Sequence, residues 1–365
     1  MTSKTYITTR SAIAGVAVLA AAMTGLTACG AGSGSAGGNG KALALSAALP
    51  DKVPSGTTIR IGDPQTQLAL KLSGLDKELS DAGVKVQWAN ITGGPQSITA
   101  FRANKLDCAS VAEIPSLFAH WTGTDTQVIF ESVTKDPLQN PTYKLGIAPG
   151  EHITSLADLK GKKIAYSAGQ AQGALVLRVL QKAGLTQKDV DLVDLQSTGT
   201  TYNTALGSKA VDVAPLGSAT VDTYLGQYKG ATAIDTGIRD DAANVYCLKS
   251  AVTDEAKAAA LKVYVAARTK AVLWENTHLD EWKTEYYEKN QGLSPADAEA
   301  AIKARGIDLI PANWNNAITR MQQTADLLSK EQDHPKLDVN SIVDKRFAAV
   351  EAAAAGSQAV TGDAS

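Results

Sequence analysis

Cysteine and histidine are scarce in this sequence. Of its 365 residues, 3 are cysteine and 4 are histidine. Transition-metal sites need several such side chains at short, regular spacings. Here Cys108 and Cys247 stand far apart, and the histidines are scattered. The sequence also lacks a nucleophile elbow, a phosphate-binding loop and a histidine spaced for a catalytic triad. These absences predict that the protein holds no metal or other cofactor and is not an enzyme.

Neither sign of charge is in large excess. The 35 Lys and Arg residues nearly balance the 37 Asp and Glu residues, which leaves a net charge of −2. Proteins that bind nucleic acids carry a clustered basic surface, so we expect no nucleic-acid partner. The length exceeds one ordinary domain and is typical of two lobes.

The first residues have the pattern of an export signal. Lys4 and Arg10 precede any acidic residue, and an apolar run over 11–23 is too short to span a bilayer comfortably. Leu-Thr-Ala-Cys at 26–29 resembles the lipobox of bacterial lipoproteins, in which the cysteine is lipidated. The alternative is an ordinary secretory signal in which Cys29 occurs by chance. We expect a signal peptide over 1–28 and a lipid anchor at Cys29, on the extracytoplasmic face of the cell membrane.

Both ends of the remaining chain have low-complexity composition. Residues 30–40 are almost entirely Gly, Ser and Ala, so 29–56 is expected to be a flexible linker. Residues 346–365 end in an Ala-, Gly- and Ser-rich stretch, which we expect to be a disordered tail.

Between these ends, short apolar runs alternate with amphipathic stretches, which is the pattern of an α/β fold. The expected strands are 58–62, 84–88, 107–111, 127–133, 190–195, 210–213, 232–235 and 244–249, and residues 155–166 are expected to form a short helix, a Gly turn and a further strand. The expected helices include 67–82, 174–183, 256–274, 279–289, 295–305 and 313–329. The chain after residue 254 is therefore expected to be mostly helical.

Several segments, in order, carry a family resemblance. The most specific is Leu-Ala-Asp-Leu-Lys-Gly-Lys-Lys-Ile-Ala at 156–165; others are Gly-Gly-Pro at 93–95 and Lys-Ala-Gly-Leu at 182–185. From about residue 57 to 344 the chain resembles the solute-binding proteins of ABC importers for aliphatic sulfonates, taurine and nitrate. The resemblance implies a monomer that binds a small molecule and partners an ABC permease and its ATPase.

The same resemblance implies a two-lobed periplasmic-binding-protein-like fold of type II, with the ligand cleft between the lobes. The two hinge crossings are then expected near Lys144–Ala148 and Arg239–Val245. Lobe 1 would comprise 57–146 plus 245–345, and lobe 2 would comprise 147–240.

Ligands of such sheets sit at the carboxyl ends of strands, against helix N-termini. The residues expected there are Gln65, Thr92, Gly93, Gly94, Glu113, Gly169, Gln170, Gln172, Gly217 and Ser218. Compared with the family, this chain has an amide and an alanine where hydroxyls are common, and Gly217 where a tryptophan is common. These departures favour a polar, zwitterionic or nitrogen-containing solute over a plain alkanesulfonate.

Two questions stay open at this stage. In the family fold the strands that hold Cys108 and Cys247 are neighbours, so a disulfide and two buried free thiols are both compatible with the sequence. A surface lipoprotein that senses a ligand is an alternative to an importer component, because both use the same closure. An enzyme on this fold is a third reading, although the Cys-rich motif of the related pyrimidine-biosynthesis enzymes is absent.

Overall fold

The structure is a computed structural model that describes residues 41–197, 200–240 and 242–361, with only the backbone for Ser218 and Ala219. The expected signal peptide, the lipidation at Cys29 and residues 29–40 of the expected linker lie outside the described residues. Within the described part of the chain, no helix combines the length and the apolarity needed to cross a membrane.

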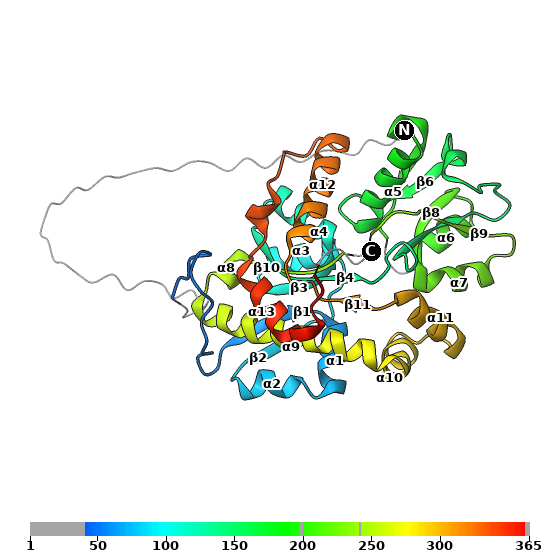
Figure 1. The fold of residues 1–365 in the computed structure, drawn as a ribbon. Coiled ribbons are helices and arrows are strands. Elements are labelled where there is room, and N and C mark those ends of the chain that lie inside the picture. Colours follow the sequence, from blue (N-terminus) through cyan, green and yellow to red (C-terminus); the bar gives the residue numbers. More distant parts are fainter. Residues whose placement is uncertain (1–40, 198–199, 241, 362–365) are drawn as a thin grey trace, which may run out of the picture. The chain divides into compact units, whose positions relative to one another are not determined.

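The strands form two sheets (Figure 1). The six-stranded sheet has the order β11-β4-β10-β3-β1-β2, and the five-stranded sheet has the order β7-β6-β8-β5-β9. The first contains β1 (Thr58–Gly62), β2 (Lys85–Trp88), β3 (Cys108–Ala112), β4 (Thr126–Thr134), β10 (Ala243–Leu248) and β11 (Asp308–Leu309). The second contains β5 (Tyr143–Ile147), β6 (Lys163–Tyr166), β7 (Asp191–Asp194), β8 (Val213–Gly217) and β9 (Thr232–Asp235).

Helices connect and cover these strands. The helices that follow the early strands are α1 (Pro64–Ser73), α2 (Asp76–Asp81), α3 (Gly94–Arg102) and α4 (Glu113–Trp121). Those among the strands of the second sheet are η1 (Leu156–Leu159), α5 (Ala171–Lys182), η2 (Gln187–Asp189), α6 (Thr201–Gly207) and α7 (Ser218–Gln227). After β10 come α8 (Lys249–Val252), α9 (Glu255–Thr277), α10 (Leu279–Trp282), η3 (Lys283–Asn290), α11 (Pro295–Arg305), α12 (Asn315–Glu331), η4 (Val339–Ile342), α13 (Arg346–Ala355) and η5 (Gly356–Gln358).

The six-stranded sheet combines parallel and antiparallel strands and is covered by helices. β1 is parallel to both β2 and β3, whereas β10 is antiparallel to β3 and β4. All nine residues of β4 are buried, and α9 and α13 pack beside the sheet (Figure 1). Five of the nine residues of β4 are polar, so β4 is not the continuous apolar run that is typical of a strand covered on both faces. The parallel strands β1, β2 and β3 bring their carboxyl ends to one edge.

Several expected boundaries differ from the structure. Lys144–Ile147 lie within β5, which pairs with β8 and β9, so the chain reaches the second sheet at Tyr143 and the crossing precedes the expected Lys144–Ala148. The strand expected at 210–213 begins only at Val213. The helix expected over 67–82 is two helices, because Gly74 adopts a left-handed conformation (φ 72°) that ends α1.

Parts of the expected linker and tail are ordered. In the segment 41–56, Leu43 N donates to Thr253 O at 2.7 Å, and Leu45 and Leu49 pack against the core. The expected tail begins with α13, whose Phe347 and Ala355 are buried against the core. Composition alone misled here, because an alanine-rich helix becomes stable once one face packs on a neighbour such as α9.

Cys108 and Cys247 are direct cross-strand partners on β3 and β10, with their Cα atoms 4.0 Å apart, and they form a disulfide. Both residues are fully buried. The bond therefore joins two strands of the six-stranded sheet whose positions in the sequence are separated by 139 residues.

Candidate binding site

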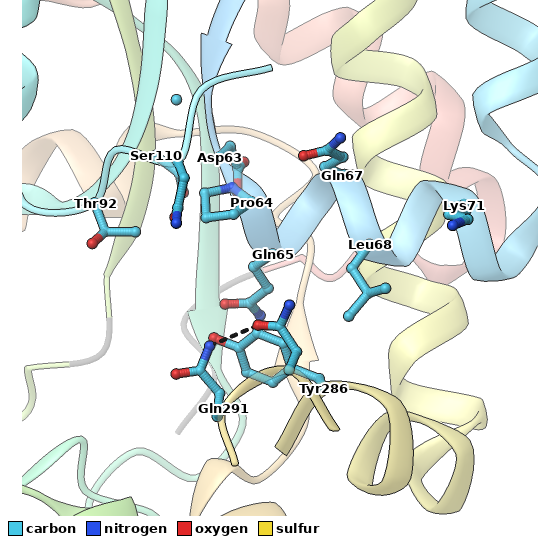
Figure 2. A pocket seen from close by; sticks show the side chains of 13 residues that line it. Asp63, Pro64, Gln65, Gln67, Leu68, Lys71, Thr92, Ser110, Tyr286 and Gln291 are labelled. Carbon is cyan, nitrogen blue, oxygen red and sulfur yellow. Dashed lines mark hydrogen bonds between the residues drawn. The ribbon is translucent and has the colours of Figure 1, made fainter. Parts of the chain in front are cut away.

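A cavity of about 860 Å³ opens at the carboxyl ends of β1, β2 and β3. Figure 2 shows its lining side chains. They are mostly amides and hydroxyls, and the lining comprises Gly62, Asp63, Pro64, Gln65, Gln67, Leu68, Lys71, Asn90, Thr92, Ser110, Tyr286, Asn290 and Gln291. In an open α/β sheet this edge, where the chain order of neighbouring strands reverses between β1 and β3, is where ligands bind.

Asp63, which lines this cavity, forms a buried ion pair with Arg268. Asp63 caps α1, since its Oδ1 accepts from Thr66 N at 3.1 Å, and it is 3% exposed. Arg268 of α9 forms an ion pair with Asp63, and Tyr264 Oη donates to Asp63 Oδ2 at 3.2 Å. The N-terminus of α1 is therefore already occupied by a carboxylate whose charge is compensated, so it does not act as an anion site here.

Arg268 also orients Ser110, the central residue of β3. Its NH2 donates to Ser110 Oγ at 3.1 Å, and its guanidinium lies over the Phe130 ring, 4.5 Å from the centroid. Because an arginine only donates, Ser110 Oγ is the acceptor in this bond and its own proton remains available.

Gln65, on the first turn of α1, reaches toward the opposite wall (Figure 2). Its Nε2 donates to Glu275 Oε2 at 3.4 Å. Glu275 is 3% exposed and pairs with Arg305 NH2 at 3.0 Å. Burial raises the pKa of Glu275 to about 7, against the opposing effect of Arg305.

The opposite wall is η3, a π-helix. Such helices are rare and occur often at functional sites. Tyr286 stacks on the buried Trp282 at a centroid distance of 4.7 Å, and burial raises the pKa of Tyr286 to about 12, so its hydroxyl stays a donor. Gln291 Nε2 donates to Asn290 Oδ1 at 2.9 Å, which is the bond drawn in Figure 2.

The glycine-rich turns expected on both sides of the cleft do meet. A Cβ on Gly94 would lie 2.6 Å from Pro115 Cγ and 3.5 Å from Gly169 O. A Cβ on Gly169 would lie 3.0 Å from the Phe118 ring. The turn before α5 thus packs directly on α3 and α4. Gly94 therefore packs against Pro115. This packing differs from the open cleft that we expected at Gly94 from the sequence.

Gln170 has a local role in this structure. Its Oε1 accepts from Ser167 Oγ and from Ser197 N, the latter at 3.0 Å, and the residue is buried. This amide therefore ties the β6–α5 turn to the segment after β7. Gln172 is half-buried on the first turn of α5.

Glu113 lies apart from the large cavity. It faces a smaller one of about 40 Å³ that is also lined by Ala171 and Arg178. Glu113 Oε1 lies 3.6 Å from Arg178 NH2. On the second sheet, an added Cβ on Gly217 would come no closer than 3.9 Å to any neighbour, and Ser218 begins α7.

Of the ten expected ligand residues, the structure therefore brings Gln65 and Thr92 into the large cavity. Asn90 and Ser110 were missed, although Asn90 follows the end of β2, Ser110 lies within β3, and both carry polar side chains. Tyr286, Asn290 and Gln291 had no local signal, because they come from a helical segment far along the chain. Within the described residues, no group of His, Cys, Asp and Glu could hold a metal ion.

Comparisons with known sequences agree with the resemblance seen in the residues. The sequence model of the NMT1/THI5 like family matches residues 79–274. A Bacillus subtilis (strain 168) protein named for binding aliphatic sulfonates is 25% identical over 297 residues, which cover 79% of this chain and 86% of that protein. An Escherichia coli (strain K12) protein of the same name is 32% identical over 106 residues, which cover 29% of this chain. That match spans about a third, 32%, of the E. coli protein.

Solved structures show the fold. The alkanesulfonate-binding protein SsuA from Xanthomonas axonopodis pv. citri, bound to MOPS, superposes with a TM-score of 0.66 at 21% identity, covering 80% of this chain and 99% of that one. The desulfurization enzyme DSZB superposes with a TM-score of 0.58 at 16% identity, covering 81% of this chain and 98% of that one. The expected periplasmic-binding-protein fold is thereby confirmed. Since enzymes share this fold, it does not by itself assign a function.

Proposed function

The chain belongs to the NMT1/THI5-like family, and from that premise we propose that it is the solute-binding component of an ABC importer. In this role it captures a small polar solute outside the cytoplasm and delivers it to a permease and its ATPase. The observation that carries the proposal is the polar cavity of about 860 Å³ at the carboxyl ends of β1, β2 and β3. Relatives named for binding aliphatic sulfonates support the general class of solute.

The lining of the cavity supports a solute that both donates and accepts hydrogen bonds. Asp63 is compensated by Arg268, and Glu275 by Arg305, so neither carboxylate presents a free charge to the cavity. Lys71 is an exposed cation at its border. This balance favours a polar, zwitterionic or nitrogen-containing relative of the aliphatic sulfonates over a plain alkanesulfonate.

We further propose that binding is coupled to closure of the two lobes around the hinge segments 135–142 and 236–240, which follow strands β4 and β9. Contacts between segments of the two expected lobes support this proposal. Gln187 Nε2 donates to Glu331 O at 2.7 Å, and Gly94 faces Gly169. In this proposal Gly93, Gly169, Gln170, Gln172, Gly217, Ser218 and Glu113 border the cleft when the lobes separate.

Lipid attachment at Cys29 would hold the monomeric protein on the extracytoplasmic face of the membrane. The lipobox-like Leu-Thr-Ala-Cys at 26–29 supports this step. A ligand-sensing surface lipoprotein is the alternative that uses the same closure. Uptake of labelled solute in cells with and without the protein separates the two, since only the importer component is required for uptake.

The solute itself is identified by mass spectrometry of small molecules released from the freshly purified, denatured protein. Titration calorimetry with taurine, propane-1-sulfonate and nitrate then compares candidate classes. Thr92→Val should raise the Kd about fivefold, the equivalent of one neutral hydrogen bond worth ~1 kcal/mol. Thr319→Val, a matched change on the exposed face of α12, should leave the Kd unchanged. Equal affinities in wild type and Thr92→Val would remove the cavity from the binding site, and consumption of a bound solute would favour an enzyme.

A further inference from the structure

The amide of Gln65 has a defined direction. Its neighbour on one side is the Glu275 carboxylate, at 3.4 Å from Nε2. An ionised carboxylate only accepts hydrogen bonds, so the NH2 group of the amide must face it. Because the two ends of an amide point in different directions, Oε1 is the end of Gln65 left for the cavity that this residue lines.

Glu275 is held firmly enough to impose this direction. It is almost fully buried on α9, and Arg305 NH2 binds its Oε2 at 3.0 Å. The same Arg305 group donates to Asp308 Oδ2 at 2.8 Å, which ties α11 to β11. The charged and titratable groups that act on Glu275 from the packed elements are Arg305, Asp308, Arg268, Tyr286 and Tyr287.

Ser110 has the opposite polarity. Its Oγ accepts from Arg268 NH2, so its own proton is free to be donated toward the cavity. Arg268 in turn is fixed by Asp63 and by Thr66 Oγ1. The cavity therefore offers an acceptor at Gln65 and a donor at Ser110.

We propose that Glu275 is a positioning residue that holds the Gln65 carbonyl oxygen toward the cavity, so that the site selects a solute carrying an N–H donor at that end and an acceptor group near Ser110. An amino-sulfonate, or a zwitterion of similar size, has this chemistry. The selection rests on the proposed solute-binding function, whereas the orientation of the amide does not.

The pH dependence follows from the same geometry. Above a pH of about 7 Glu275 is ionised and dictates the amide direction. Below it, the protonated carboxyl both donates and accepts, so the amide is released from a single orientation. The preference for a donor-bearing solute should thus be strong at alkaline pH and weaken as the pH falls.

The orientation is tested without any ligand. In ¹⁵N spectra of the full-length protein, the side-chain NH2 signal of Gln65 is assigned by its loss in Gln65→Met. We expect this signal to shift between about pH 5.5 and pH 8.5 in wild type and to stay constant in Glu275→Gln. A Gln65 signal that does not respond to pH in wild type overturns the proposal. So does a shift that persists unchanged in Glu275→Gln.

Selection is tested with taurine and propane-1-sulfonate, which differ by an ammonium in place of a methyl group. Wild type at alkaline pH should bind taurine about tenfold more tightly, and this ratio should fall about threefold or more in Glu275→Gln and in Gln65→Met. Ser110→Ala should weaken both probes alike and preserve the ratio. A ratio unaffected by both Glu275→Gln and Gln65→Met overturns the proposal, even if both affinities drop.

The two tests distinguish failure of the proposed solute class from failure of the inference about Glu275. If neither probe binds wild type, the proposed solute class is wrong, and the pH response of the Gln65 signal still decides the inference. If Glu275→Gln does not fold, Gln65→Met and the wild-type pH profile of the affinity ratio decide it: a ratio that is flat with pH is incompatible with control by Glu275.

Discussion

Reduction of the Cys108–Cys247 disulfide is expected to destabilise the protein strongly. The bond joins residues 139 positions apart, so in the unfolded chain it closes a long loop. The loop-closure entropy of such a cross-link corresponds to about 5 kcal/mol at 25 °C, which we take as an upper value. The closed loop includes all five strands of the second sheet, β5 to β9. Reduction therefore frees that whole region in the unfolded state, while the folded state loses only one buried bond.

Equilibrium urea denaturation with and without reductant measures this difference on the same polypeptide. We expect the free energy of unfolding to fall by about 2 to 5 kcal/mol on reduction. A Cys29→Ser background leaves two cysteines of the three in the sequence, so thiol counting under denaturing, non-reducing conditions should find no free thiol. The double variant Cys108→Ala/Cys247→Ala should be insensitive to reductant. Two free thiols would refute the disulfide, and superimposable urea curves would refute the entropy argument.

Three further predictions concern other parts of the chain. Cys29→Ser should release the protein from the membrane fraction or leave it unprocessed, and normal membrane association of the variant would contradict lipid anchoring. Gly94→Val should cost about 1 to 3 kcal/mol of folding free energy, because the new Cβ would meet Pro115 at 2.6 Å; an unchanged urea midpoint would show that the contact relaxes freely. Burial raises the pKa of Glu351, and that of Glu131, well above the ordinary value, so the native state favours their protonated forms. Wild-type stability should therefore fall as the pH rises above about 4.3, and Glu351→Gln should gain stability relative to wild type between about pH 5 and pH 8. Urea midpoints at both pH values check this, and a pH-independent difference would argue against it.

Local patterns were sufficient for most of the secondary structure. β1, β2, β9 and β10 lie within one residue of their expected bounds, because short segments that contain β-branched or aromatic residues, with apolar and polar positions alternating in β1 and β2, are a local signal of strands. α11 occupies its expected range and α9 nearly so. The two-lobed fold was predicted from the family resemblance, of which residues 156–165 are the most specific part, because hydrophobic periodicity alone does not specify a fold.

Errors arose where stability depends on a partner far along the chain. α13 has the alanine-rich composition of a flexible tail, yet Phe347 is buried in the core. The segment 41–56 reads as a linker, yet Leu43 bonds to Thr253. In each case contacts with distant parts of the chain supply the free energy that offsets the entropy lost on ordering the segment. The local sequence pattern does not reveal these contacts.

The residues of the candidate site likewise include some that the sequence predicts and some that only the folded structure reveals. Gln65 and Thr92 were predictable, because a strand end followed by a helix is a local feature and ligands gather there. The wall formed by Tyr286 and the neighbouring residues of η3 was not, because only the folded chain brings it opposite α1. The sequence determined that Gln65 is an amide at the edge of the sheet. Tertiary structure decided which end of that amide faces the cavity, because the buried carboxylate of Glu275 accepts hydrogen bonds and cannot donate them while it is ionised.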